Sequence, residues 1–252
     1  MCDSFVCVTE QPALSIGNVP QLALDLFANS LGLSHVCHVD SDLLLPLCGY
    51  DCYAPPQTGV LCTPAELFRR GADAASDALA LLQLRTPPAP GLARLWCESL
   101  AKWVKDRAGA ARVVLLVTVP SSRATRDARD LPRLVANEAW GEIKNHEGKE
   151  GQDTPWQPLE GSPMMEDVLS EGSVTARLYA ELGKQGVPTM IMATYCAEGD
   201  NVPDAVAVAS WCARYFGLVS SKEEQFTWKP PESWNASTFW GGAVDDCAQE
   251  YL

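Results

Sequence analysis

The chain has 252 residues, and 47% of them are hydrophobic, which is enough for a substantial core in one large α/β domain or two small ones. The formal net charge of −13 argues against binding to nucleic acid, which needs a basic footprint, and against a polybasic attachment to an anionic membrane. No apolar run in the sequence is long enough to span a bilayer.

Residues 1–119 predict alternating strands and helices. Short apolar or β-branched runs bounded by turn residues predict strands, and these runs are residues 5–8, 35–39, 78–84 and 112–119. Apolar residues spaced three or four apart predict a helix at 19–31, with Asp25 and Asn29 together on its opposite side, and another at 91–107. The last two strands and the helix between them form a βαβ unit, which implies a parallel pair of strands with a right-handed crossover.

A polar stretch separates this half from the last predicted elements. Residues from about 120 to 172 are mixed in charge, include a part rich in Gly and Pro, and show little periodicity, so we expect a surface excursion there. It is not a domain boundary, because a helix at 173–185, a strand at 188–196 and a helix at 202–216 resume the earlier pattern. We therefore expect one α/β domain over residues 1–252, with a C-terminal tail at about 235–252.

The sequence Asn-Val-Pro opens two of the predicted helices. Asn18 and Asn201 are predicted N-caps, whose side-chain oxygens would accept a free N–H of the first turn. Pro20 and Pro203 fit the first turn, where no intrahelical N–H is needed. The simpler interpretation is two ordinary capped helices that follow buried strands. The alternative hypothesis is that both helices belong to one assembly surface.

The helix at 202–216 is apolar nearly all round. One stripe carries small and branched apolar residues, and a second stripe holds Val208, Trp211 and Tyr215. A helix of this kind is buried on more than one side, either in a single large core or under a partner subunit. We hypothesise that Val208, Trp211 and Tyr215 contribute to partner binding.

Patterns typical of catalysis are missing from the sequence. There is no glycine-rich nucleotide loop after a strand, no Walker loop and no Gly-x-Ser-x-Gly elbow. His35 and His38 are three apart in a predicted strand, so their side chains should point to opposite faces, and we predict no metal site. Carboxylates at Glu198, Asp200 and Asp204 surround the second Asn-Val-Pro, where acidic groups usually complement the helix dipole.

Ten cysteines are present, but no two are spaced as Cys-x-x-Cys. The opening residues lack a basic and apolar leader, and several cysteines fall within apolar stretches. We therefore expect reduced thiols in a cytosolic protein, without a disulfide framework or bound metal.

Five segments together resemble the proteasome assembly chaperone 2 family. They are residues 15–23 with Asp25 and Leu26, residues 81–85, residues 103–105 leading to 111–113, residues 198–205, and residues 228–234. The two Asn-Val-Pro segments and Trp228-Lys229-Pro230 are specific in combination, whereas residues from about 120 to 171 depart from the family.

The resemblance implies a three-layer α/β/α sandwich with a largely parallel or mixed central sheet. It also implies a non-enzymatic chaperone without cofactors, located in the cytoplasm and the nucleus. Such a chaperone would pair with proteasome assembly chaperone 1, and the heterodimer would promote assembly of the α-subunit ring of the 20S proteasome. The rival hypothesis is a small-molecule enzyme of phosphorylase or hydrolase type that uses Glu198, Asp200 or Asp204. A third hypothesis is an adaptor whose polar stretch at 137–163 recruits another protein.

Some relatives end in a hydrophobic residue, Tyr and any residue, and that tail inserts between α subunits. Tyr251 and Leu252 match the last two positions, but Glu250 replaces the hydrophobic residue. A terminal carboxylate paired with a lysine would favour docking, whereas a charged Glu250 costs desolvation. Both a docked tail and a frayed terminus remain open.

Overall fold

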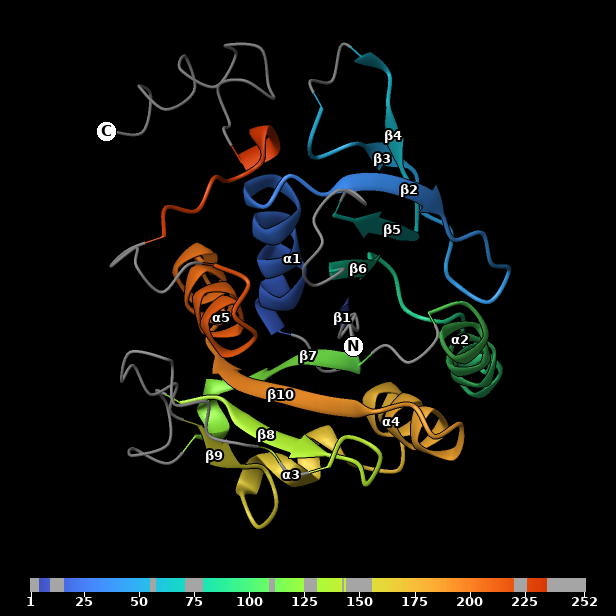
Figure 1. Cartoon of the computed structure of the whole chain (residues 1–252), viewed down its shortest axis with the longest axis vertical. Helices are drawn as coiled ribbons and strands as arrows, with labels where there is room; N and C mark the ends of the chain where they lie inside the picture. The colour runs from blue at the N-terminus through green and yellow to red at the C-terminus, as the bar shows by residue number, and fades with distance from the viewer. Residues whose placement is uncertain are drawn as a thin grey trace.

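The computed structural model describes residues 5–9, 16–54, 58–70, 79–108, 112–124, 131–141, 143, 156–219 and 226–234. In this part of the chain eight strands form one sheet in the order β2-β5-β6-β1-β7-β10-β8-β9, and β3 pairs with β4 beside it (Figure 1). The strands are β1 (Phe5–Thr9), β2 (Ser34–His38), β3 (Gly49–Tyr50), β4 (Leu61–Cys62), β5 (Ala65–Arg69), β6 (Leu79–Leu84), β7 (Arg112–Pro120), β8 (Arg133–Ala136), β9 (Gln157–Pro158) and β10 (Thr189–Cys196).

Helices cover both faces of the sheet. They are α1 (Val19–Ser30), α2 (Ala93–Ala108), α3 (Pro163–Val168), α4 (Val174–Lys184) and α5 (Val202–Tyr215). Helices α1 and α5 pack on one face, and α2, α3 and α4 on the other (Figure 1). The expected three-layer α/β/α sandwich with a mixed sheet is confirmed. Among the described helices, none has both the length and the hydropathy that crossing a bilayer requires.

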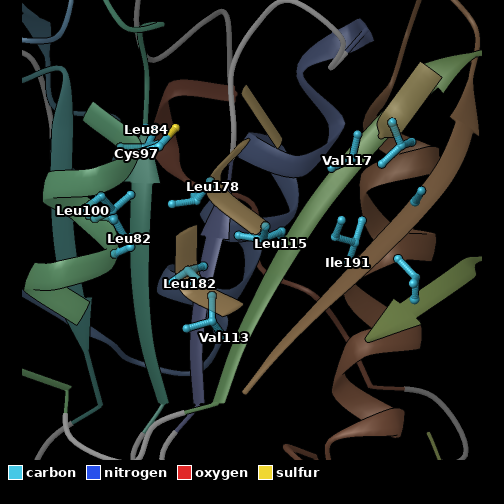
Figure 2. Close-up of a cluster of buried hydrophobic side chains, with 14 of the residues drawn as sticks. Leu82, Leu84, Cys97, Leu100, Val113, Leu115, Val117, Leu178, Leu182 and Ile191 are labelled. Carbon is cyan, nitrogen blue, oxygen red and sulfur yellow. The ribbon is translucent and has the colours of Figure 1, made fainter. Parts of the chain in front are cut away.

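The central strands supply side chains to two separate cores. In β7, Val113, Leu115 and Val117 face α2 and α4, whereas Val114 and Leu116 face α1 and α5. Figure 2 shows the first of these cores, in which side chains of β6, β7 and β10 meet those of α2 and α4. Because side chains alternate along a strand, a continuous apolar run is what a strand covered on both faces requires.

The predicted βαβ unit is correct in direction but not in pairing. β6 and β7 are both parallel to β1, which lies between them and hydrogen-bonds to each. The pattern of residues 78–119 fixes how its two strands run but not which other strand inserts between them. That choice is made by the N-terminal strand, which is distant in sequence.

Part of the predicted surface excursion belongs to the sheet. β8 pairs antiparallel with β10, and Leu134, Leu159 and Met164 of this region are fully buried. The strands and α3 are only two to six residues long, too short for a periodic pattern to stand out. The region therefore contributes a sheet edge and a short covering helix.

Candidate functional site

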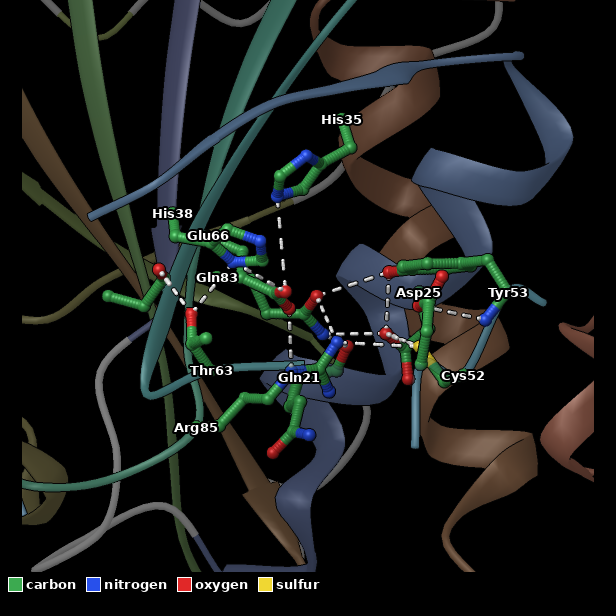
Figure 3. Close-up of polar contacts among 12 residues, drawn as sticks. Gln21, Asp25, His35, His38, Cys52, Tyr53, Thr63, Glu66, Gln83 and Arg85 are labelled. Carbon is green, nitrogen blue, oxygen red and sulfur yellow. Dashed lines mark hydrogen bonds and ion pairs between the residues drawn. The ribbon is translucent and has the colours of Figure 1, made fainter. Parts of the chain in front are cut away.

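A group of polar side chains is buried where α1 meets β5 and β6 (Figure 3). Asp25 of α1, Glu66 of β5 and Gln83 of β6 are each no more than 3% exposed. Gln83 alternates with Leu82 and Leu84, so it lies on the sheet face that α1 covers. Buried polar groups of this kind need partners inside the protein.

Asp25 receives three hydrogen bonds on one carboxylate oxygen. Its Oδ1 accepts from Gln83 Nε2 (2.6 Å), from the Tyr53 hydroxyl (2.8 Å) and from the Cys52 thiol (3.7 Å). Burial raises the pKa of Asp25, while the nearby Arg85 charge and these hydrogen bonds oppose that rise. The spacing of apolar residues in the sequence predicts Asp25 beside Asn29 on the non-core side of the helix. That placement missed its burial, because the loop that carries Cys52 and Tyr53 covers this side of α1.

Arg85 joins this group to Glu66. Its Nε donates to Glu66 Oε2 at 3.0 Å, and its terminal nitrogen donates to Gln83 Oε1 at 3.0 Å. The Glu66–Arg85 pair is nearly inaccessible to solvent, with side-chain exposures of 4% and 7%. A buried charge pair that also has further hydrogen bonds is the arrangement in which such charges are tolerated.

His35 and His38 complete the cluster on the outer side of Glu66. Glu66 Oε1 lies 3.5 Å from His38 Nδ1 and 4.0 Å from His35 Nε2, and the imidazole centroids are 4.5 Å apart. The prediction that these histidines face opposite sides of the strand is wrong. The pairing of β2 with β5 shifts register between His35 and Cys37, and this bulge turns both histidines to the same side.

A cavity of ≈ 170 Å³ opens beside the histidines. His35, His38 and Glu66 line it together with apolar Val60, Leu61 and Phe68. The sequence offers little signal for this site, because its residues come from segments spread between positions 25 and 85 and only the tertiary fold brings them together. The one local clue is the charge of Glu66 and Arg85 next to apolar strands.

The chemistry of the cluster favours binding over nucleophilic catalysis. Burial raises the pKa of the Cys52 thiol, and the negative charge of Asp25 adds to this rise. Burial also raises the pKa of the Tyr53 hydroxyl well above its usual range. A thiol that stays protonated is a poor nucleophile. The two imidazoles are the solvent-exposed groups of the cluster, and the outer oxygen of buried Glu66 faces them.

The predicted partner-binding stripe lies largely inside the chain's own core. Val208 is 7% exposed and Tyr215 is 4% exposed, and both belong to the core that α1 and α5 share. Trp211 is half-buried and stacks on Tyr215, with ring centroids 4.7 Å apart. Partner binding by this stripe stays a prediction, with Trp211 as its accessible member.

The two Asn-Val-Pro helix starts meet in space, where Gly17 lies against the side chain of Asn201. Both helices begin at the Val, with Pro20 and Pro203 in their first turns, but neither Asn18 nor Asn201 makes a side-chain capping bond. The predicted capping is therefore wrong in its chemistry. Asn18 has a left-handed backbone (φ 54°), and Asn201 Oδ1 instead accepts from the Cys196 thiol at 3.1 Å.

The carboxylates near α5 serve the start of that helix. Asp200 Oδ1 accepts the Val202 N–H at 3.1 Å, so it satisfies one N–H of the first turn from the residue before the N-cap. Asp204 Oδ2 lies 3.8 Å from the Cys196 thiol, whose pKa burial and Asp204 raise to about 11. Glu198 is exposed, and Tyr251 and Leu252 lie outside the described residues.

Residues 226–234 lie across α1 and α5. Trp228 packs edge-on against Phe27 and donates its indole N–H to Ser210 Oγ at 2.8 Å. Asn29 Nδ2 donates to the backbone carbonyls of Lys229 and Pro230, each at 3.0 Å. This segment, which includes the family-like Trp228-Lys229-Pro230, therefore holds the outer sides of the two helices together.

Comparisons with known proteins all find similarity to the PAC2 family or to proteins described as proteasome assembly chaperones or their homologs. The sequence model of the PAC2 family matches residues 11–224. Proteins named proteasome assembly chaperone 2 are 28% identical over 246 residues in Bos taurus, covering 90% of each chain, and 30% identical over 237 residues in Xenopus tropicalis, covering 88% of each chain. The structure of Pyrococcus furiosus PbaA, described as an archaeal homolog of proteasome-assembly chaperone, has a TM-score of 0.58 and 15% sequence identity. It matches 88% of this chain and 81% of PbaA, and it supports the fold.

Proposed function

Because this chain belongs to the PAC2 family, we propose that it is a chaperone that promotes assembly of the 20S proteasome. The observation that carries the proposal is similarity along nearly the whole chain to proteins named proteasome assembly chaperone 2. The matched region includes both Asn-Val-Pro helices, whose starts pack together.

In its finer form the proposal has two kinds of partner. The chain pairs with proteasome assembly chaperone 1, and the heterodimer supports the α-subunit ring in the cytoplasm and the nucleus without turning over a substrate. Raised pKa values keep the thiols of Cys52 and Cys196 protonated, which favours a binding role over nucleophilic catalysis.

An exposed apolar surface supports a protein partner. Of the nine exposed large hydrophobic side chains in the described part of the chain, six lie between positions 36 and 61. These six, which we call the edge patch, are Val36, Leu45, Leu47, Tyr50, Val60 and Leu61. They come from β2, the loop after it, β3, β4 and the residue just before β4, which gather at one end of the sheet (Figure 1). Concentrated exposed apolar side chains mark protein-binding surfaces.

The two surfaces are assigned to the two partners. The accessible Trp211 on α5 keeps its predicted role toward the sister chaperone. The edge patch then faces the α subunits, because a heterodimer that rests on a ring needs a second surface. Strand β2 is the edge of the sheet that the described residues form, so its backbone adds hydrogen-bonding groups to this surface.

Copurification tests the proposal. A tagged full-length chain is expressed in cells of the organism that encodes it. One sister chaperone and proteasome α subunits should copurify with it and be identified by mass spectrometry. Loss of the chain should reduce assembled 20S particles on native gels. Recovery of neither partner, together with unchanged 20S levels after deletion, would reject the proposal.

A further inference from the structure

We propose that His35, His38 and Glu66 form a binding site for a divalent first-row transition-metal ion, with Zn²⁺ as the best-suited ion. The donor atoms of these three residues all lie within 4.8 Å of one another. The inference concerns residues that the proposed chaperone role does not use, and it does not depend on that role.

Glu66 is held in place for this task. The carboxylate is 3% exposed, and its Oε2 is fixed by Arg85 Nε at 3.0 Å. The other oxygen, Oε1, is left facing the two imidazoles. A ligand carboxylate that is itself hydrogen-bonded on its outer oxygen is typical of protein metal sites, because the bond fixes its orientation.

The histidines need only a small adjustment. Zinc–nitrogen and zinc–oxygen bonds of about 2.0–2.2 Å in a tetrahedral arrangement place neighbouring donor atoms about 3.3–3.5 Å apart. Glu66 Oε1 is already 3.5 Å from His38 Nδ1 and 4.0 Å from His35 Nε2. The side chains of His35 and His38 are 38% and 49% exposed, so they are free to close this gap by rotation.

One contact competes with metal binding. His38 Nδ1 also lies 3.1 Å from the Thr63 hydroxyl, and coordination through Nδ1 would replace that hydrogen bond. Thr63 retains a second partner, since its hydroxyl donates to the Ala65 carbonyl at 3.2 Å. The exchange therefore leaves no buried group without a hydrogen bond.

The ligand set selects the kind of ion. Two imidazoles and one carboxylate suit Zn²⁺ and its first-row neighbours, whereas Ca²⁺ and Mg²⁺ prefer oxygen ligands alone. The cavity of ≈ 170 Å³ leaves space for a fourth ligand such as water. Asp51 also lines this cavity and adds negative charge, which partly offsets the cationic Arg85 behind Glu66.

The site would clamp the edge of the sheet. His35 and His38 lie on edge strand β2, whereas Glu66 lies on β5, so the ion would link two strands that already pair. An ion that binds the folded chain raises the melting temperature. The clamp would also fix β2 beside Val60 and Leu61 of the edge patch.

Metal titration of the purified full chain tests the proposal. After chelator treatment, the wild-type protein should bind one Co²⁺ with the absorption spectrum of nitrogen and oxygen ligands. One equivalent of Zn²⁺ should then displace this Co²⁺ from the same site. His35→Ala and His38→Ala should each weaken Zn²⁺ binding by about ten-fold or more, since each removes a ligand. Both variants should also lose the rise in melting temperature on adding Zn²⁺.

His146→Ala is the matched control, because it removes the third histidine of the sequence and should leave binding unchanged. Circular dichroism checks that the variants fold, which the exposure of both histidines favours. Glu66→Gln should also weaken binding, but it leaves buried Arg85 without its anion, so the histidine variants decide the test. Absence of binding, equal affinity in the wild type and both histidine variants, or a thiolate-to-cobalt band that shows cysteine ligation would overturn the proposal.

Discussion

At the scale of single residues, Asp25 shows how a polar helix position outside the apolar stripe becomes buried in the folded chain. The spacing of apolar residues in α1 places Asp25 away from the helix's apolar stripe. A loop distant in sequence then covers it, and Gln83, Tyr53 and Cys52 supply its hydrogen bonds. The carboxyl becomes a buried acceptor.

This burial predicts a pH dependence of stability. The pKa of Asp25 is raised in the folded protein, so the folded chain binds a proton more tightly than the unfolded chain. As pH rises through the raised pKa, Asp25 must ionise in the core, and its contribution to the free energy of unfolding falls. Asp25→Asn keeps the oxygen that accepts all three hydrogen bonds but does not titrate. Relative to this variant, the wild type should therefore lose stability as pH rises from about 4 toward neutrality.

Urea unfolding of the two proteins over a pH series measures this difference, and titrating groups that do not interact with Asp25 cancel in the comparison. Parallel curves would mean that folding leaves the pKa of Asp25 unshifted, and a wild type that gains stability over Asp25→Asn as pH rises would mean that the buried group is stabilised as a carboxylate. Either result would contradict the prediction.

At the scale of elements, the two Asn-Val-Pro helices depend on one close approach. Gly17 precedes α1 with φ 72°, and a methyl group at this position would overlap the side-chain amide of Asn201 before α5. Asn201 cannot move freely, because its Nδ2 donates to the Gly199 carbonyl at 2.9 Å and its Oδ1 accepts from Cys196 at 3.1 Å. The repeated motif therefore joins two helix starts.

Gly17→Ala should destabilise the fold for two reasons, the left-handed backbone and the overlap with Asn201. We expect a loss of about 1–3 kcal/mol in the free energy of unfolding, measured by urea denaturation. Gly32→Ala is the matched control, because Gly32 has φ 63° but open space around its Cα. Gly17→Ala should cost more than the control, and Asn201→Ala should restore part of the difference. Equal losses in both glycine variants would show that only the backbone conformation matters.

Helix α5 carries a prediction about the sister chaperone. Trp211 stacks on buried Tyr215 but is itself only half-buried. Trp211→Asp should abolish copurification of the sister chaperone while the monomer stays folded, because a charge opposes burial at an interface. Ala180→Asp adds the same charge at an exposed position of α4, on the opposite face of the sheet, and should have no effect. A Trp211→Asp chain that unfolds would instead assign Trp211 to the core.

At the scale of the whole molecule, the edge patch sits at the end of the sheet where β2 has no further neighbour among the described strands. Leu61→Asp should reduce recovery of α subunits and leave recovery of the sister chaperone unchanged. Leu95→Asp is its control, since Leu95 lies on α2 and is 47% exposed against 46% for Leu61. Pull-down with quantitative mass spectrometry measures both. The same loss in the two variants would show a general effect of added charge on binding.

The sequence by itself determined the longer helices and five of the strands. Apolar spacing gave α1, α2, α4 and α5, and short apolar runs gave β1, β2, β6, β7 and β10, because periodicity is a local property of the backbone. The resemblance to proteasome assembly chaperone 2 gave the layer order, which the fold confirms. Short elements such as β8 and β9 escaped notice, since two to four residues carry no period.

The tertiary structure alone decided which distant residues meet. It inserted β1 between β6 and β7, buried Asp25 under the loop that carries Tyr53, and brought Gly17 against Asn201. A single bulge in β2 turned His35 and His38 to one side and built the cluster with Glu66. These contacts arise when segments far apart in the chain pack together. A local pattern of residues does not specify which distant segments it will contact.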